Sequence, residues 1–112
     1  MRFVLVLLSS LAVAGCGGAY STTPNGPPVV TTSVELRNTA FNPAVIQVSP
    51  GTTVTFTNND GINHNVTFSS ASITSIGDFS TGSKTAVMPT VTGTYAYQCT
   101  IHPGMTGSVQ VQ

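Results

Sequence analysis

The sequence contains very few charged residues and no long amphipathic helical pattern. Only 5% of its 112 residues are Asp, Glu, Lys or Arg, and the formal net charge at pH 7 is zero. Three Lys and Arg residues cannot form a basic patch, so nucleic acid is excluded as a partner. The abundant Thr, Ser, Asn and Gln residues, which alternate with Val, Ile and Phe, are typical of an exported β domain.

The N-terminal residues are typical of a bacterial lipoprotein signal peptide. Met1 and Arg2 precede an apolar run at residues 3–8, which is too short to span a bilayer as a helix. The segment 11–16, Leu-Ala-Val-Ala-Gly-Cys, resembles a lipobox, in which cleavage occurs before the cysteine and its thiol is acylated. We therefore predict a signal peptide over residues 1–15 and a lipid anchor at Cys16 on the periplasmic or extracytoplasmic face of a bacterial membrane.

An ordinary signal peptide is the alternative. Cleavage near Ala14 or Ala19 would leave Cys16 free, or paired in a disulfide with Cys99. Acylation of Cys16 would instead leave Cys99 free of any disulfide.

Residues 16–28 form a predicted flexible tether, and residues 29–112 form a single predicted domain. The tether is rich in Gly, Pro, Ser and Thr and has no apolar periodicity. About a dozen such residues span roughly 20 Å as a random coil, so we expect the tether to provide reach rather than recognition. The remaining length suits one small domain with one core.

Apolar and polar residues alternate through the predicted domain, as they do in half-buried β-strands. With turn residues between the runs, this pattern predicts an all-β fold, a two-sheet antiparallel Greek-key β-sandwich. Residues 69–92 fit several registers and are expected to form one or two strands, with Met88 in the core and Asp78 at the surface. The predicted inward-facing sets are Val34 and Leu36; Ile46 and Val48; Val54 and Phe56; His64, Val66 and Phe68; Tyr95, Tyr97 and Cys99; and Val109 and Val111.

One loop between the last two predicted strands collects donors that suit a soft transition metal. Cys99, His102 and Met105 follow the spacing Cys-x-x-His-x-x-Met, and His64 is the only other histidine. Two imidazoles, one thiolate and a weak thioether describe a type 1, or blue, copper electron-transfer site. We therefore predict that these four residues bind one copper ion.

Two alternatives to copper ligation are a degenerate sandwich without metal and a zinc site. An inward-facing histidine is often a core residue, and a buried methionine is ordinary core filling. Zinc is the weaker alternative, because a thioether is a poor zinc ligand. The agreement of four positions favours copper.

The predicted domain resembles the cupredoxins, the small blue copper proteins that include plastocyanin and amicyanin. The resemblance covers residues 34–112, and the short spacing from Cys99 to Met105 is similar to that of amicyanin. It implies that His64, Cys99 and His102 are equatorial ligands and that Met105 is a long axial ligand. The motifs that carry the resemblance are Phe-Asn-Pro at 41–43, residues 48–58, His-Asn at 64–65, and residues 93–99 running into the ligand loop.

The same resemblance implies roles for three neighbours of the ligands. Asn65 is expected to brace the ligand loop through its side chain, with its backbone N–H near the cysteine sulfur. Tyr95 matches a tyrosine-corner position. Ile101 stands where plastocyanin and amicyanin carry proline, so its backbone keeps an N–H, which we expect to turn toward the sulfur of Cys99.

The function expected from these features is one-electron transfer between extracytoplasmic redox partner proteins by a membrane-anchored monomer. Protein fills all four ligand positions, so no open coordination site remains for a substrate and we expect no enzymatic activity. Periplasmic copper binding and delivery without electron transfer is the alternative, and an adhesion sandwich is another. By resemblance, electrons would pass through the exposed edge of His102, inside a rim formed by Pro103, Gly104, Met105, Gly61 and Ile62.

Overall fold

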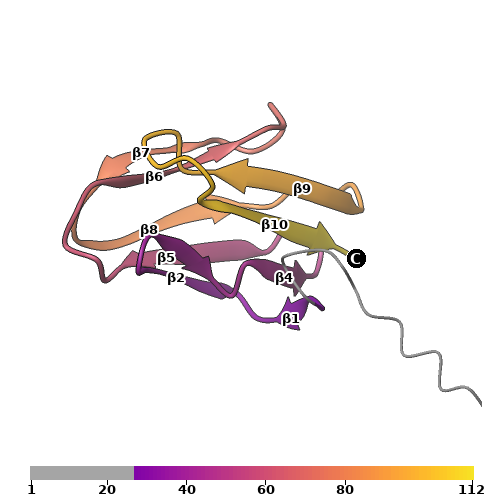
Figure 1. The fold of residues 1–112 in the computed structure, drawn as a ribbon. Helices are drawn as coiled ribbons and strands as arrows, with labels where there is room; N and C mark the ends of the chain where they lie inside the picture. The colour runs from indigo at the N-terminus through magenta and orange to yellow at the C-terminus, as the bar shows by residue number, and fades with distance from the viewer. Residues whose placement is uncertain (1–26) are drawn as a thin grey trace, which may run out of the picture.

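The protein is a β-sandwich of ten strands in the described part of the chain (Figure 1). The computed structural model describes residues 27–112, so the predicted signal peptide, Cys16 and the tether up to residue 26 lie outside the described residues. Within residues 27–112, no helix is long and apolar enough to cross a membrane. The strands are β1 (Val29–Val30), β2 (Ser33–Arg37), β3 (Ala40–Asn42), β4 (Val45–Val48), β5 (Thr53–Asn58), β6 (His64–Phe68), β7 (Ile76–Phe79), β8 (Gly82–Val87), β9 (Gly93–Gln98) and β10 (Thr106–Val111).

The strands form two sheets, as the sequence predicts. One sheet has the order β1-β4-β10-β9-β6-β7 and the other β3-β2-β5-β8. Among the pairings described, β1 with β4, β4 with β10, and β2 with β5 are parallel, so the purely antiparallel sandwich expected from the sequence is wrong in that detail. The alternation of apolar residues reports which face of a strand is buried and carries no information on strand direction.

The buried faces follow the predicted alternation. Val34, Leu36 and Val54 are fully buried, and both Val109 and Val111 lie in the same core. Residues 69–92 contribute two strands, β7 and β8, with Met88 buried and Asp78 exposed as expected. The burial of these residues joins the inner faces of both sheets into one hydrophobic core.

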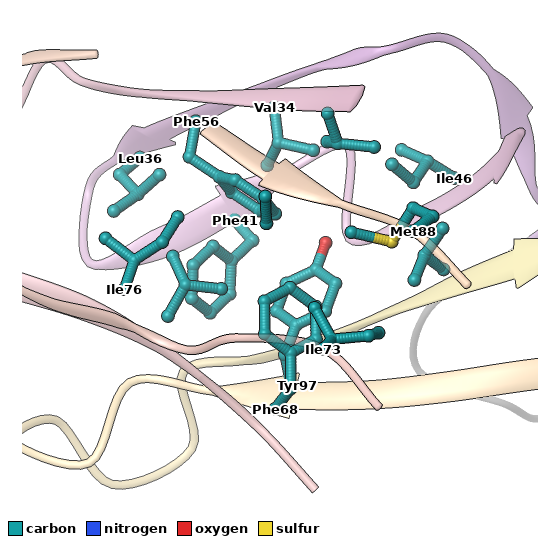
Figure 2. Close-up of a cluster of buried hydrophobic side chains, with 14 of the residues drawn as sticks. Val34, Leu36, Phe41, Ile46, Phe56, Phe68, Ile73, Ile76, Met88 and Tyr97 are labelled. Carbon is teal, nitrogen blue, oxygen red and sulfur yellow. The ribbon is translucent and has the colours of Figure 1, made fainter. Parts of the chain in front are cut away.

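Tyr97 occupies the centre of that core (Figure 2). Its ring lies 4.9 Å from Phe41, 5.5 Å from Phe56 and 5.3 Å from Phe68, between ring centroids, and the first two pairs are edge-to-face. Gly107 on β10 allows this packing, because a Cβ atom there would lie 2.5 Å from the Tyr97 ring. The aromatic cluster therefore couples β9, which leads directly to Cys99, to both sheets.

The hydroxyl groups of Tyr95 and Tyr97 have opposite environments, although both tyrosines lie on β9. Tyr95 donates its O–H to the carbonyl of Val91 at 2.7 Å, as expected of a tyrosine corner. The buried Tyr97 hydroxyl has no hydrogen-bond partner among residues 27–112. Burial raises the pKa of Tyr97, so this hydroxyl stays protonated.

Replacement of Tyr97 by phenylalanine is expected to stabilise the fold. The change removes one buried oxygen atom without a partner and keeps the ring, so we expect the free energy of unfolding to rise by about 1 kcal/mol. Urea denaturation of residues 27–112 measures it. Tyr95→Phe is the matched control and should lower the free energy by about 1 kcal/mol, because it removes a hydrogen bond. Equal destabilisation by Tyr97→Phe and Tyr95→Phe would show that the Tyr97 hydroxyl forms a hydrogen bond in the folded protein.

Candidate metal centre

Two strands of the larger sheet and the loop between β9 and β10 bring the predicted ligands together. His64 is the first residue of β6, and Cys99 comes directly after β9. These strands pair antiparallel, with Thr67 opposite Gln98. Figure 1 shows the loop after β9 lying against β6 and β7 at one end of the sandwich. Because the two strands are antiparallel, the chain that continues after Gln98 runs toward the beginning of β6, where His64 lies.

Three donor atoms converge at this end of the sandwich. Cys99 Sγ lies 3.8 Å from His64 Nδ1 and 3.3 Å from His102 Nδ1, and the two nitrogen atoms are 3.1 Å apart. His64 and Cys99 are buried, whereas His102 is half-buried. Within residues 27–112, this is the group of His, Cys, Asp and Glu side chains arranged to hold a metal ion.

The dimensions of this triangle fit a single metal ion. The circle through the three atoms has a radius of about 2 Å, calculated from the three separations. Typical bonds from a transition metal to imidazole nitrogen or thiolate sulfur are about 2.0–2.3 Å long. One ion can therefore contact all three donors without rearrangement of the side chains, and the set of soft and imidazole donors suits copper.

The ligand loop is closed by its own backbone. Cys99 N–H donates to the carbonyl of Met105 at 2.9 Å, and Met105 N–H donates to the carbonyl of His102 at 3.2 Å. Met105 is 2% exposed, which places its side chain in the core. The expectation that Met105 forms part of the exposed rim around His102 is therefore wrong, because the loop turns Met105 inward. The other rim residues, Gly61, Ile62, Pro103 and Gly104, are exposed as expected.

Asn65 braces the loop through its side-chain amide. Its Nδ2 donates to Thr100 Oγ1 at 2.8 Å and to Asp78 Oδ1 at 2.9 Å. Its Oδ1 accepts from the backbone N–H of Thr100 at 3.1 Å and from the hydroxyl of Thr67 at 2.9 Å. This one amide ties the residue after Cys99 to β6 and β7. Asn65 is itself buried, although alternation along β6 puts it on the face opposite His64.

Asp60, in the loop between β5 and β6, is a further neighbour of the site. Its Oδ2 lies 2.7 Å from His64 Nε2, and backbone N–H groups of Asn38 and Thr39 donate to its two oxygen atoms, each at 2.8 Å. The N–H of Thr39 is the largest cause that lowers the pKa of Asp60, and the hydrogen bond with His64 acts in the same direction. The carboxylate is therefore ionised at neutral pH.

Comparison with known proteins agrees with this geometry. A family model described as "Copper binding proteins, plastocyanin/azurin family" matches residues 28–112. This chain belongs to that family of cupredoxins. Amicyanin-alpha of Methylorubrum extorquens is 28% identical over 116 residues, which cover 100% of this chain and 98% of that protein.

Solved cupredoxin structures share the fold. An oxidised amicyanin variant has 28% identity and a TM-score of 0.64, with 71% of this chain and 80% of that chain covered. A purple cupredoxin from Nitrosopumilus maritimus has 26% identity and the same TM-score of 0.64, with 71% of this chain and 98% of that chain covered. This cupredoxin therefore has the His-Cys-His-Met arrangement of a copper site, consistent with one type 1 copper ion.

Two finer expectations about the site stay predictions. They are hydrogen bonds to Cys99 Sγ from the backbone N–H groups of Asn65 and Ile101. The Ile101 side chain is 45% exposed beside the site. No sequence motif pointed to Asp60 or to the Asn38–Thr39 turn. Asp60 lies four residues before His64, but the turn that it bonds lies 21 and 22 residues away in the sequence.

Replacement of Asn65 by alanine is expected to loosen the ligand loop. The change removes the acceptor of the Thr100 N–H, so hydrogen exchange at this amide should become at least tenfold faster in the metal-free protein. We also expect the free energy of unfolding to fall by about 1–3 kcal/mol. Exchange followed by NMR measures the first effect, and urea denaturation measures the second.

Thr67→Val is the matched control for Asn65→Ala. It removes one hydrogen bond to the same amide but keeps both contacts with Thr100. Exchange at Thr100 should change little in this variant. Unchanged exchange at Thr100 in Asn65→Ala would contradict the bracing role.

Proposed function

We propose that residues 29–112 transfer single electrons between extracytoplasmic redox partner proteins through a copper ion held by His64, Cys99, His102 and Met105. The observation that carries this proposal is the convergence of three donor atoms, all within 4.8 Å of one another, in a member of a copper-binding family. A bound copper ion supplies one-electron chemistry by alternating between Cu(II) and Cu(I). The similarity to amicyanin supports the role of an electron carrier rather than an enzyme.

The protein's own contribution is to hold the donors in one arrangement. His64 is fully buried and Cys99 is 3% exposed, so water has little access to either ligand. The loop bonds between Cys99 and Met105 and the Asn65 amide limit movement of the donors. This donor set is ideal for neither Cu(II) nor Cu(I). Because the protein holds it in one arrangement, little rearrangement accompanies electron transfer.

Electrons are proposed to enter and leave through His102. This ring is half-buried, and the neighbouring side chains of Ile62 and Ile101 are 46% and 45% exposed. An apolar surface around the ring suits brief docking of a redox partner. Because the chain carries only three acidic and three basic residues, long-range electrostatic steering contributes little.

Copper delivery fits the burial of the ligands less well than electron transfer does. A delivery site has to release its ion to a partner, which favours ligands open to solvent. Here His64, Cys99 and Met105 are each 3% exposed or less. Their burial favours retention of the metal, and therefore an electron carrier.

Replacement of Cys99 by serine is expected to abolish an intense blue absorption band of the Cu(II) form. The band in this family arises from charge transfer between thiolate and Cu(II), and serine offers no thiolate. Visible spectroscopy of residues 27–112 after addition of Cu(II) measures it. Asn63→Ser, at an exposed position near His64, is a control that should keep the band. A blue Cys99→Ser variant would contradict the ligand assignment.

We also propose that acylation of Cys16 holds the domain on a bacterial membrane, facing the extracytoplasmic side, with residues 17–28 as the tether. In bacteria that make the full-length chain, Cys16→Ser should remove fatty-acid labelling and shift the protein out of the membrane fraction. Cys99→Ser is the control, because it removes the other cysteine and should leave the labelling intact. Unchanged labelling of the Cys16→Ser variant would contradict the anchor.

A further inference from the structure

The carboxylate of Asp60 connects a tight turn of the smaller sheet to a proposed metal ligand of the larger sheet. Oδ1 accepts the N–H of Asn38, and Oδ2 accepts both the N–H of Thr39 and the Nε2–H of His64. The three donor-acceptor distances are 2.7–2.8 Å, which are short for N–H···O hydrogen bonds. One negative charge is thus shared by a turn and an imidazole.

The turn itself has a conformation that favours such a partner. Asn38 and Thr39 link β2 to β3, and both have positive φ angles, 54° and 56°. Asn tolerates this conformation, but a β-branched residue such as Thr rarely adopts it. Two N–H groups that point to one carboxylate offset that unfavourable conformation. The Asn38–Thr39 turn therefore holds Asp60 in place as much as Asp60 holds the turn.

Hydrogen bonds within the loop after β5 also hold Asp60 in position. Its backbone N–H donates to Asn58 Oδ1 at 2.9 Å. The Nδ2 of Asn58, a residue only 4% exposed, donates to the carbonyls of Ile62 and Phe79. The loop that follows β5 thus presents the carboxylate in one position, and a shift of Asp60 would break bonds on both sides.

This arrangement decides which nitrogen of His64 faces the other donors. An ionised carboxylate can only accept hydrogen bonds, so Nε2 carries the proton of the neutral imidazole. Nδ1 then presents its lone pair toward Cys99 Sγ and His102 Nδ1. His64 is fully buried, so Asp60 and not bulk water is the partner of its Nε2. Within residues 27–112 the structure records a carboxylate partner for His64 and none for His102.

We propose that Asp60 is a positioning residue of the metal centre, which holds the Nε2–H tautomer of His64 and favours Cu(II) over Cu(I). The preference for Cu(II) follows because a hydrogen bond to a carboxylate makes the imidazole a stronger donor. The inference rests on the proposed function for its copper part. The part that concerns the tautomer of His64 applies to the metal-free protein as well.

The copper part is tested by the reduction potential of Asp60→Asn, a variant of nearly the same shape without the charge. Loss of an outer partner of a ligating histidine typically weakens metal binding 10–100-fold. We expect Cu(II) affinity to fall at least tenfold relative to Cu(I), and a tenfold change raises a one-electron potential by about 59 mV. Voltammetry of both proteins at one pH measures the shift.

Asp78→Asn is the matched control for the charge. Asp78 contacts Asn65 rather than a ligand, so this variant also removes one carboxylate from beside the site. The reduction potential of Asp78→Asn should rise by less than half of the rise expected for Asp60→Asn. An unchanged potential in Asp60→Asn, or equal shifts in the two variants, would overturn the inference while leaving a copper-binding wild type and the proposed function intact.

The tautomer part is tested without copper, by long-range ¹H–¹⁵N NMR of the histidine rings in metal-free wild-type protein at pH 8. We expect His64 to carry its proton on Nε2. A proton on Nδ1 would overturn the inference, whether or not Asp60→Asn folds. If the wild type binds no copper, the proposed function fails, and this spectrum still decides whether Asp60 sets the tautomer.

Discussion

The side-chain amide of Asn65 is the interaction on which the arrangement of the site most depends. The amide nitrogen donates two hydrogen bonds and the amide oxygen accepts two. Together these four bonds join β6, β7 and the ligand loop at one point. His64 precedes this residue, and Thr100, which it holds, follows Cys99. The distance between the two buried ligands is therefore set by one fully satisfied amide together with the pairing of β6 and β9.

A second link, through Asp60, reaches the site from the other sheet. The smaller sheet contributes none of the four proposed ligands, yet its Asn38–Thr39 turn is bonded to the carboxylate that accepts the proton of His64. The aromatic cluster around Tyr97 joins the same two sheets. Movement of the donors would require disruption of both layers, which is the rigidity that an electron carrier needs.

Much of the fold and most of the donor set could be predicted from the sequence. Period-two alternation identified the buried face of most strands, and the spacing of Cys99, His102 and Met105 in one loop identified the site. The parallel pairings could not be predicted, because alternation is the same for both directions. The role of Asp60 depends on a loop that brings its carboxylate to His64 and to the distant Asn38–Thr39 turn, and the inward turn of Met105 depends on backbone bonds that close the ligand loop.

The central claim is that one copper ion binds to two imidazoles and one thiolate at the same time. X-ray absorption spectroscopy at the copper edge, on residues 27–112 loaded with one equivalent of Cu(II), tests it most directly. The expected spectrum has one short copper–sulfur contact and two copper–nitrogen contacts with imidazole scattering. A spectrum with only nitrogen and oxygen neighbours would contradict the claim, because Cys99 would then lie outside the copper coordination sphere.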